Sequence, residues 1–154
     1  MGLEVCKLSL VNFKISIPTD NENYFRLNCP YCRHNFKLNS DEFNENDKPN
    51  LYCPACGLTN EIQTFYTPQI YKKAEAIAMN YVEDQLANMF KQLGKKNSKN
   101  FKVTSKFTPN NYEPEIYEID DNLIIINNSC CNKKSKVTEL DAWIIPYCPY
   151  CGGR

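Results

Sequence analysis

The sequence predicts an α+β fold in which two small β lobes, each built around four cysteines, are joined by one long amphipathic helix and a lysine-rich linker. Two clusters of cysteines lie near the two ends of the chain. Between them comes a stretch with apolar residues at helical spacing, and then a stretch rich in lysine and asparagine. The expected parts are 1–66 (N-terminal strands and the first cysteine lobe), 67–94 (helix), 95–111 (basic linker) and 112–154 (second lobe).

Length and composition are those of a folded soluble protein. The 154 residues fit one compact domain or two very small ones, with 42% hydrophobic and 23% charged residues. No apolar run approaches the ~20 residues that cross a bilayer, and the N-terminus lacks the pattern of an export signal. Nine cysteines without such a signal indicate a reducing compartment. We therefore expect a cytoplasmic protein that uses its thiols for metal and not for disulfides.

Short strands are expected around the cysteines. Residues 3–17 alternate apolar and polar with a phase slip near Val11 and Asn12, as in a bulged strand or a tight hairpin. Further strands are predicted at 24–27, 36–38, 51–52, 116–119 and 123–126.

One helix of about seven turns is predicted over 67–94. Thr67 suits the N-cap, Pro68 the first helical position and Gly94 the stop. Its apolar stripe consists of Ile70, Ala74, Ile77, Ala78, Tyr81, Met89 and Leu93. We expect this stripe to be buried within the chain, and the alternative is that it binds a partner helix.

The first cysteine cluster has the spacing of a zinc ribbon. Cys29 and Cys32 form one C-x-x-C pair, and after twenty intervening residues Cys53 and Cys56 form the next, followed by Gly57. Two thiolates separated by two residues can chelate one face of a tetrahedral ion. The alternative is a rubredoxin-like iron site, which shares the four-sulfur geometry.

The second cluster consists of Cys130, Cys131, Cys148 and Cys151. Its last pair repeats the pattern of the first cluster, whereas Cys130 and Cys131 are adjacent. Adjacent side chains on extended backbone point apart, so joint chelation needs a local distortion. We assign all four as ligands of a second zinc ion. Cys6 is the competing fourth ligand, although a small core residue on the first strand is the more ordinary role for it.

The two clusters also indicate an internal repeat. When Cys131 is laid on Cys32, residues 136–137 fall on 37–38 and Asn128 falls on Cys29. We therefore expect Asn128 to take no part in metal binding.

With its C-P-x-C-G motifs at both ends, the chain resembles the double zinc-ribbon proteins of bacteria. The resemblance covers residues 24–66 and about 123–154. It implies two zinc ions and a ribbon fold. Such ribbons occur in transcription machinery, translation factors, primases, mobile-element proteins and antiviral-defence proteins, so the resemblance implies fold and metal better than activity.

Four aromatic and histidine residues beside the cysteines need an interpretation. His34 is expected to be a solvent-facing turn residue, because four cysteines already complete the first site. Trp143 is expected on a strand, packed against the ribbon. Tyr31 and Tyr150 occupy matching positions inside their C-x-x-C turns, where they can stack on bases or shield the metal.

No catalytic machinery is recognisable, so we expect no enzymatic activity. One histidine rules out a histidine-based zinc triad, and the sequence has no phosphate-binding loop and no nucleophile elbow. No site for a small-molecule substrate is evident either.

The charge balance favours a protein-bound subunit over an independent nucleic-acid binder. The 18 basic and 18 acidic residues cancel, and two four-thiolate zinc sites would bring the protein to about minus four. A local basic patch is still offered by Lys95, Lys96, Lys99 and Lys102. We therefore expect a small adaptor in a larger bacterial or phage assembly that acts on nucleic acid. The alternatives are an independent DNA- or RNA-binding protein and an iron electron carrier.

Overall fold

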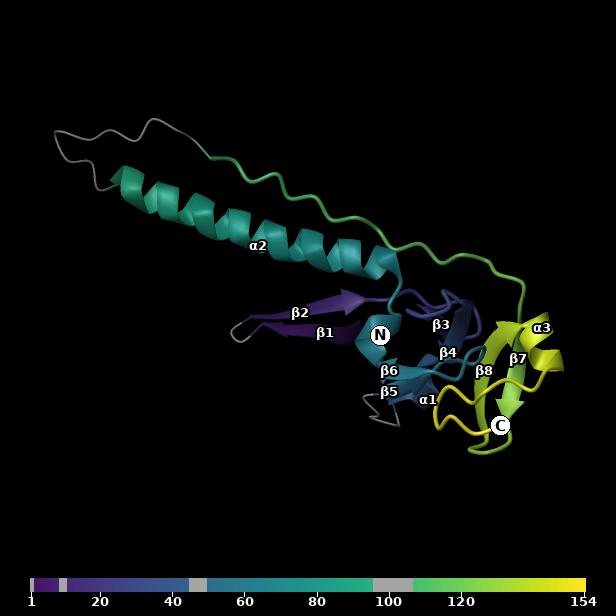
Figure 1. Cartoon of the computed structure of the whole chain (residues 1–154). Coiled ribbons are helices and arrows are strands. Elements are labelled where there is room, and N and C mark those ends of the chain that lie inside the picture. Colours follow the sequence, from purple (N-terminus) through teal and green to yellow (C-terminus); the bar gives the residue numbers. More distant parts are fainter. Residues whose placement is uncertain (1, 9–10, 45–49, 96–106) are drawn as a thin grey trace.

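The computed structural model describes residues 2–8, 11–44, 50–95 and 107–154. It is a mixed α+β structure in which a body of short strands carries one long helix, α2 (Pro68–Lys95). Helix α2 and an N-terminal hairpin extend to one side of this body, and the chain then returns alongside α2 to enter the last strands (Figure 1). The predicted division into four parts is not tested by this arrangement.

The N-terminal segment forms a hairpin, as expected. Strand β1 (Gly2–Leu8) pairs antiparallel with β2 (Val11–Ser16). The register shifts between Glu4 and Lys7, and Lys7 pairs with Asn12, so the bulge lies in β1 beside the position where the phase slip was predicted.

The first ribbon, residues 24–66, begins with a hairpin of β3 (Tyr24–Asn28) and β4 (Asn35–Asn39). The short helix α1 (Ser40–Asn44) follows, then β5 (Asn50–Tyr52), β6 (Thr59–Glu61) and the 3-10 helix η1 (Ile62–Phe65). The three predicted strands of this part are confirmed. Helix α1, strand β6 and the 3-10 helix η1 were not predicted, because they are too short for a periodic pattern.

The second ribbon, residues 123–154, repeats this order with β7 (Leu123–Asn128), β8 (Lys133–Thr138) and α3 (Glu139–Trp143). The strand predicted at 123–126 is confirmed, whereas 116–119 is irregular backbone. The expectation of a strand at Trp143 is wrong. Thr138 has extended backbone and its side chain accepts a hydrogen bond from the N–H of Asp141, which caps a helix there instead.

The two ribbons share one four-stranded sheet of order β3-β4-β8-β7, a contact that the sequence analysis did not predict. The sheet is joined where β4 pairs antiparallel with β8, with Lys37 opposite Lys136 and Leu38 opposite Ser135. In the internal repeat, Lys136 is the counterpart of Lys37. Equivalent positions that face each other are the mark of a two-fold arrangement, so the chain resembles a dimer of its own repeat.

A second set of reciprocal contacts supports this two-fold relation. The N–H of Tyr52 donates to the carbonyl of Pro149 at 2.9 Å, and the N–H of Tyr147 donates to the carbonyl of Pro54 at 3.0 Å. Tyr147 and Pro149 hold the places in the second ribbon that Tyr52 and Pro54 hold in the first. The second cysteine turn of each ribbon, 53–56 and 148–151, is therefore joined to the other by a symmetric pair of hydrogen bonds.

The apolar core lies mainly in the first ribbon. Phe36 of β4 meets Phe65 of η1 edge to face, with ring centroids 5.9 Å apart, and Phe25 meets Phe43 of α1 at 5.5 Å. Ile70, at the start of α2, completes this cluster. Edge-to-face pairs of buried aromatic rings stabilise by more than the area they bury.

Helix α2 confirms the predicted 67–94 helix to within one residue at each end, but its apolar stripe is only partly buried. Ile70 is buried, while Tyr81 touches Phe13 of the hairpin and Met89 is exposed. The opposite flank of α2 is covered by the returning chain, where the side-chain amide of Asn80 donates to the carbonyl of Tyr112. The stripe was expected to pack inside the chain, and for Met89 that expectation is wrong because the helix projects beyond the ribbons. The side chain of Leu93 lies outside the described residues.

The strand pairing between the ribbons places two lysines, Lys37 and Lys136, side by side in buried positions. Asp20 lies against both: its carboxylate accepts from Lys136 at 2.7 Å and from Lys37 at 3.4 Å. Glu118 also pairs with Lys37, and Glu22 with Lys136 at 2.5 Å. The acidic residues are therefore needed to neutralise the junction of the two ribbons.

This network shifts the pKa of both its central partners. Burial by itself would raise the pKa of Asp20, but hydrogen bonds from Lys136 and from backbone N–H groups hold that pKa below its usual value. Burial by itself would lower the pKa of Lys136, and its bonds to Asp20 and Glu22 raise it instead. Both shifts favour the charged forms in the folded state.

We predict that Asp20→Asn lowers the free energy of unfolding by about 1.5–3 kcal/mol, the range for hydrogen bonds to charged groups. The lowered pKa of Asp20 stabilises the folded state above the unfolded value of ~4, and this stability is lost as the pH falls through the folded pKa. The raised pKa of Lys136 stabilises the folded state below the unfolded value of ~10.4. The loss should thus be constant from pH 5 to 9. Denaturant unfolding of the metal-saturated protein measures it, with exposed Glu75→Gln as control. A loss that varies across that window would contradict this account.

Candidate metal centres

The first cysteine group brings together the four thiols that the sequence predicted, from Cys29, Cys32, Cys53 and Cys56. All four Sγ atoms lie within 4.8 Å of one another. Cys29 and Cys56 are 3.8 Å apart and Cys32 and Cys53 are 3.6 Å apart. A zinc ion with bonds of about 2.3 Å to four sulfurs requires edges of about 3.8 Å. These two distances match the edge of a tetrahedral four-sulfur site.

Two tight turns hold these thiols. The N–H of Arg33 donates to the carbonyl of Cys29, and the N–H of Gly57 donates to that of Cys53, both at 2.9 Å. Each turn ends on left-handed backbone, with φ of 59° at Arg33 and 72° at Gly57. Glycine adopts this conformation without steric cost, whereas Arg33 adopts it because the turn requires it.

The second group is formed by Cys130, Cys131, Cys148 and Cys151, whose sulfurs also lie within 4.8 Å of one another. Cys131 and Cys148 are 3.4 Å apart, and Cys130 and Cys151 are 3.1 Å apart. These distances are shorter than the edge of a four-sulfur zinc site, so an ion would spread the sulfurs by a few tenths of an ångström. The protein thus has two four-cysteine groups, each able to hold one metal ion.

The turn that carries Cys130 explains how neighbouring cysteines can both reach the same ion. The N–H of Asn132 donates to the carbonyl of Asn128 at 2.8 Å, the counterpart of the bond between Arg33 and Cys29. Asn132 has a φ of 55°, so this turn has the same shape as the first. Asn128 fills the place of Cys29, and Cys130 supplies a thiol from the third position of the turn. The local distortion that the sequence analysis required is the turn itself.

Cys6, the competing fourth ligand, lies in β1, and its side chain is outside the described residues. The second group reaches four thiols without it. The assignment of ligands nevertheless stays a prediction.

Gly153 makes room for the displaced thiol. A Cβ added there would lie 3.2 Å from Cβ of Cys130 and 3.5 Å from Sγ of Cys151. The first ribbon has Leu58 at the corresponding position. The Gly-Gly pair after Cys151 was the sequence signal for this arrangement, and the sequence analysis did not use it.

The two groups are also shielded reciprocally. A Cβ at Gly57 would lie 2.8 Å from the ring of Tyr147, and one at Gly152 would lie 2.8 Å from the ring of Tyr52. Each glycine therefore serves two purposes, because it allows left-handed backbone and admits the tyrosine of the other ribbon. This packing brings the turns of the two groups into contact.

Burial raises the pKa of a cysteine thiol when no cation balances the charge of its thiolate. It raises the pKa of Cys53 and Cys148, which are both buried. At Cys29 burial acts in the same direction, but backbone N–H groups of Cys32 and Tyr31 hold the pKa below its usual value. Metal binding must therefore displace protons, and affinity should fall as the pH falls.

The tyrosines in the matching turns have different surroundings. Tyr31 is exposed, and its hydroxyl accepts from the side chain of Asn60 at 3.0 Å. Tyr150 is buried, and its hydroxyl donates to the carbonyl of Lys134 at 2.9 Å. The ring of Tyr150 is therefore not open to a base, contrary to the predicted contact, because the junction of the ribbons covers it.

The predicted solvent-facing position of His34 is also wrong. Its Nε2 lies 2.5 Å from Oδ2 of Asp141, a buried carboxylate of α3. In the repeat, Lys133 corresponds to His34 and Glu42 corresponds to Asp141. The ammonium of Lys133 donates to the carbonyl of Glu42 at 3.1 Å. Both contacts cross between the ribbons, which is why a turn residue is drawn inward.

Of the predicted basic contacts, Lys95 is the last residue of α2, and its side chain is not among those described. Lys96, Lys99 and Lys102 lie outside the described residues. Their role stays a prediction.

Comparison with protein-family models, with curated proteins and with solved structures gives no match to this chain. Among the described helices, none is long and apolar enough to cross a membrane.

We predict that the purified protein holds two ions, and that Cys131→Ser and Cys130→Ser each release one. The structure brings both sulfurs into the second group, and three thiols bind zinc more weakly than four. Elemental analysis with a chelator titration measures this, with Cys6→Ser as the matched control. Full metal content in Cys130→Ser together with loss of one ion in Cys6→Ser would show that the fourth ligand is misassigned.

We also predict that Gly153→Leu, which copies the first ribbon, weakens only the second site. The added side chain would meet Cys130 and Cys151, so the site should release its ion to a chelator at least tenfold faster. The matched change Leu58→Gly should leave the first site occupied. Equal release from both sites would contradict a local clash.

Proposed function

We propose that the chain is a non-enzymatic double zinc-ribbon adaptor, a small subunit of a larger bacterial or phage assembly that acts on nucleic acid. The observation that carries this proposal is an exposed apolar surface on the second ribbon, named here the α3 patch. It consists of Leu140, Trp143, Ile144 and Ile145, whose side chains are exposed to 72%, 78%, 63% and 66%. Contiguous apolar surface with an exposed tryptophan is typical of protein interfaces.

The internal repeat shows that the fold does not require apolar residues here. In the first ribbon, the positions of Leu140 and Trp143 are held by Asp41 and Asn44. Asp41 is exposed, so this position of the helix accepts a polar residue that faces solvent. The apolar choice in the second ribbon is best explained by a partner that covers it.

Backbone strain within the patch supports the same reading. Ile145 has a φ of 57°, in the left-handed region that β-branched residues rarely adopt. Helices commonly place glycine at this position after the last turn. An isoleucine that is both strained and exposed is costly for the isolated chain, so its benefit lies in binding.

The strand next to the patch adds a second apolar element. In the four-stranded sheet, β7 is an edge strand, and its Ile124 and Ile125 are exposed to 41% and 44%. The corresponding Phe25 of β3 is buried. An exposed apolar edge strand invites pairing or cover by another chain.

Zinc in both groups is part of this proposal, with a structural role. Each group offers four sulfurs, which leave no open coordination position for a substrate. Sulfur donors at this geometry also accept iron, so the electron-carrier alternative depends on the metal alone. A strongly coloured purified protein containing iron would favour that alternative, and a colourless one containing zinc would favour the adaptor.

We predict that Trp143→Ser abolishes assembly without loss of metal. Affinity purification from the native host identifies the partner, and the reconstituted pair then gives the affinity. Loss of a central tryptophan should weaken binding at least ~30-fold, as for a hot spot of 2 kcal/mol. The matched control is Tyr112→Ser, which removes an equally exposed aromatic ring away from the patch. Equal effects of the two changes, or tight nucleic-acid binding by the isolated chain, would argue against the adaptor.

A further inference from the structure

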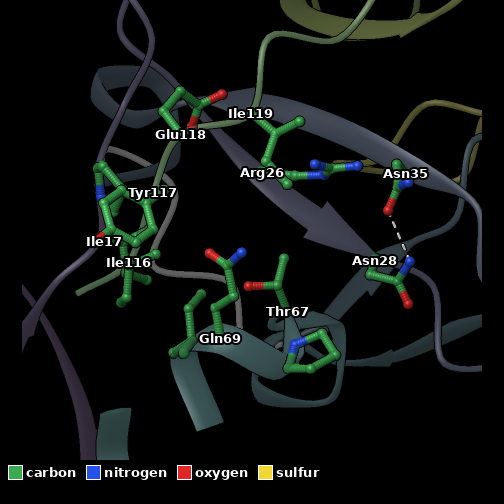
Figure 2. Close-up of a pocket in the computed structure, with 13 residues that line it drawn as sticks. Ile17, Arg26, Asn28, Asn35, Thr67, Gln69, Ile116, Tyr117, Glu118 and Ile119 are labelled. Atoms are coloured by element: carbon green, nitrogen blue, oxygen red, sulfur yellow. Dashed lines mark hydrogen bonds between the residues drawn. The ribbon is translucent and has the colours of Figure 1, made fainter. Parts of the chain in front are cut away.

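A cavity of about 310 Å³ lies between β3, the start of α2 and the returning chain at 116–119 (Figure 2). It belongs to neither cysteine group. One side is apolar, with Ile17, Ile70 and Ile116 in its wall. Tyr117 stands on the same side and is exposed to 66%, so the cavity reaches the surface beside an aromatic ring.

The other side is lined by the polar side chains of Arg26, Asn28 and Asn35, and Gln69 stands between the two sides at the start of α2 (Figure 2). The amide of Asn28 donates to Oδ1 of Asn35 at 2.8 Å and to the carbonyl of Arg33 at 3.0 Å. This leaves the oxygen of Asn28 and the amide nitrogen of Asn35 available to a ligand. Buried Nη1 of Arg26 has no hydrogen-bond partner among the described residues.

The charges around the cavity argue against a phosphate as its occupant. Nη2 of Arg26 lies 3.3 Å from Oδ2 of Asp121, so its positive charge is already balanced. Glu118, which also lines the cavity, is paired with Lys37. Among the described residues that line the cavity, no cation is left over to hold an anion, while hydrogen-bond donors and acceptors remain unpaired.

We propose that this cavity binds one base of a single-stranded nucleic acid. A base is flat and uncharged, presents donors and acceptors along one edge, and offers an apolar face for stacking. Asparagine and glutamine amides match such edges in pairs, and the exposed ring of Tyr117 provides a surface for stacking at the mouth. The size of the cavity is that of a small-ligand site. This inference rests on the proposed function for its choice of nucleic acid.

The test uses nucleosides as probes of the metal-loaded full chain. Adenosine, guanosine, cytidine and uridine are titrated separately while NMR follows the side-chain amides of Asn28, Asn35 and Gln69. Ribose 5-phosphate is the probe for a sugar-phosphate site. At least one nucleoside should shift these amides in a saturable way, and ribose 5-phosphate should not. Equal shifts from ribose 5-phosphate, or none from any nucleoside, would overturn the inference.

Two variants tie the binding to the cavity. Tyr117→Ala removes the stacking surface, and Gln69→Leu removes an amide without touching the strands; each should weaken nucleoside binding about tenfold. Tyr112→Ala, an exposed tyrosine on the same returning chain, should leave it unchanged. Equal loss of nucleoside affinity in all three variants would show that nucleosides bind outside this cavity.

The outcomes separate this inference from the adaptor function. If no nucleoside binds while a complex depends on Trp143, the cavity inference is wrong and the adaptor stands. If nucleosides bind at the cavity and no complex depends on Trp143, the adaptor is wrong and the base site stands.

Discussion

The antiparallel pairing of β4 with β8 is the contact on which the rest of the arrangement depends. It brings Lys37 against Lys136 at the centre of a shared sheet, where two like charges would repel each other in buried surroundings. Carboxylates from two segments balance these charges. Asp20 lies in the loop before β3, and Glu118 lies in the returning chain. The route of residues 107–122 past the first ribbon follows from this requirement for charge.

The same pairing places cysteines of both groups in one apolar core. Cys29, Cys53 and Cys148 are all members of the single apolar cluster, so metal and core are not separate sources of stability. Each ribbon by itself, 24–66 or 123–154, is so short that it buries too little surface to be stable without such staples. A thiol that is buried by the fold and raised in pKa, as at Cys53, is stabilised once a cation is present. Tyr52 and Tyr147 pack across the two-fold, so the turns of the two groups lie in contact with each other.

Local signals in the sequence were sufficient for the longer elements and for the grouping of thiols, whereas the short elements α1, β6, η1 and α3 were missed. Cysteine spacing, the cap at Thr67 and the alternation near the N-terminus all act within a few residues, and each predicted its feature. The relation between the ribbons was out of reach, because the β4–β8 junction is made between positions nearly one hundred residues apart. Errors at His34, Tyr150 and Trp143 share this cause: the first two are drawn into the junction, and the last is left outside it. The sequence next to each of these three residues carries no sign of these contacts.

The difference between the two halves of the repeat is informative about function. In the first ribbon, Phe25 is covered by Phe43 and joins the cluster that includes Phe65 and Ile70, while the corresponding Ile124 of the second ribbon stays 41% exposed. Two copies of one unit can pack symmetrically only at their junction, and their outer faces are free to differ. The first copy uses its outer face for internal stability. The second presents an apolar surface around Trp143 at the far end of the same sheet, so a partner that binds there would be held rigidly to both metal groups through β8 and β4.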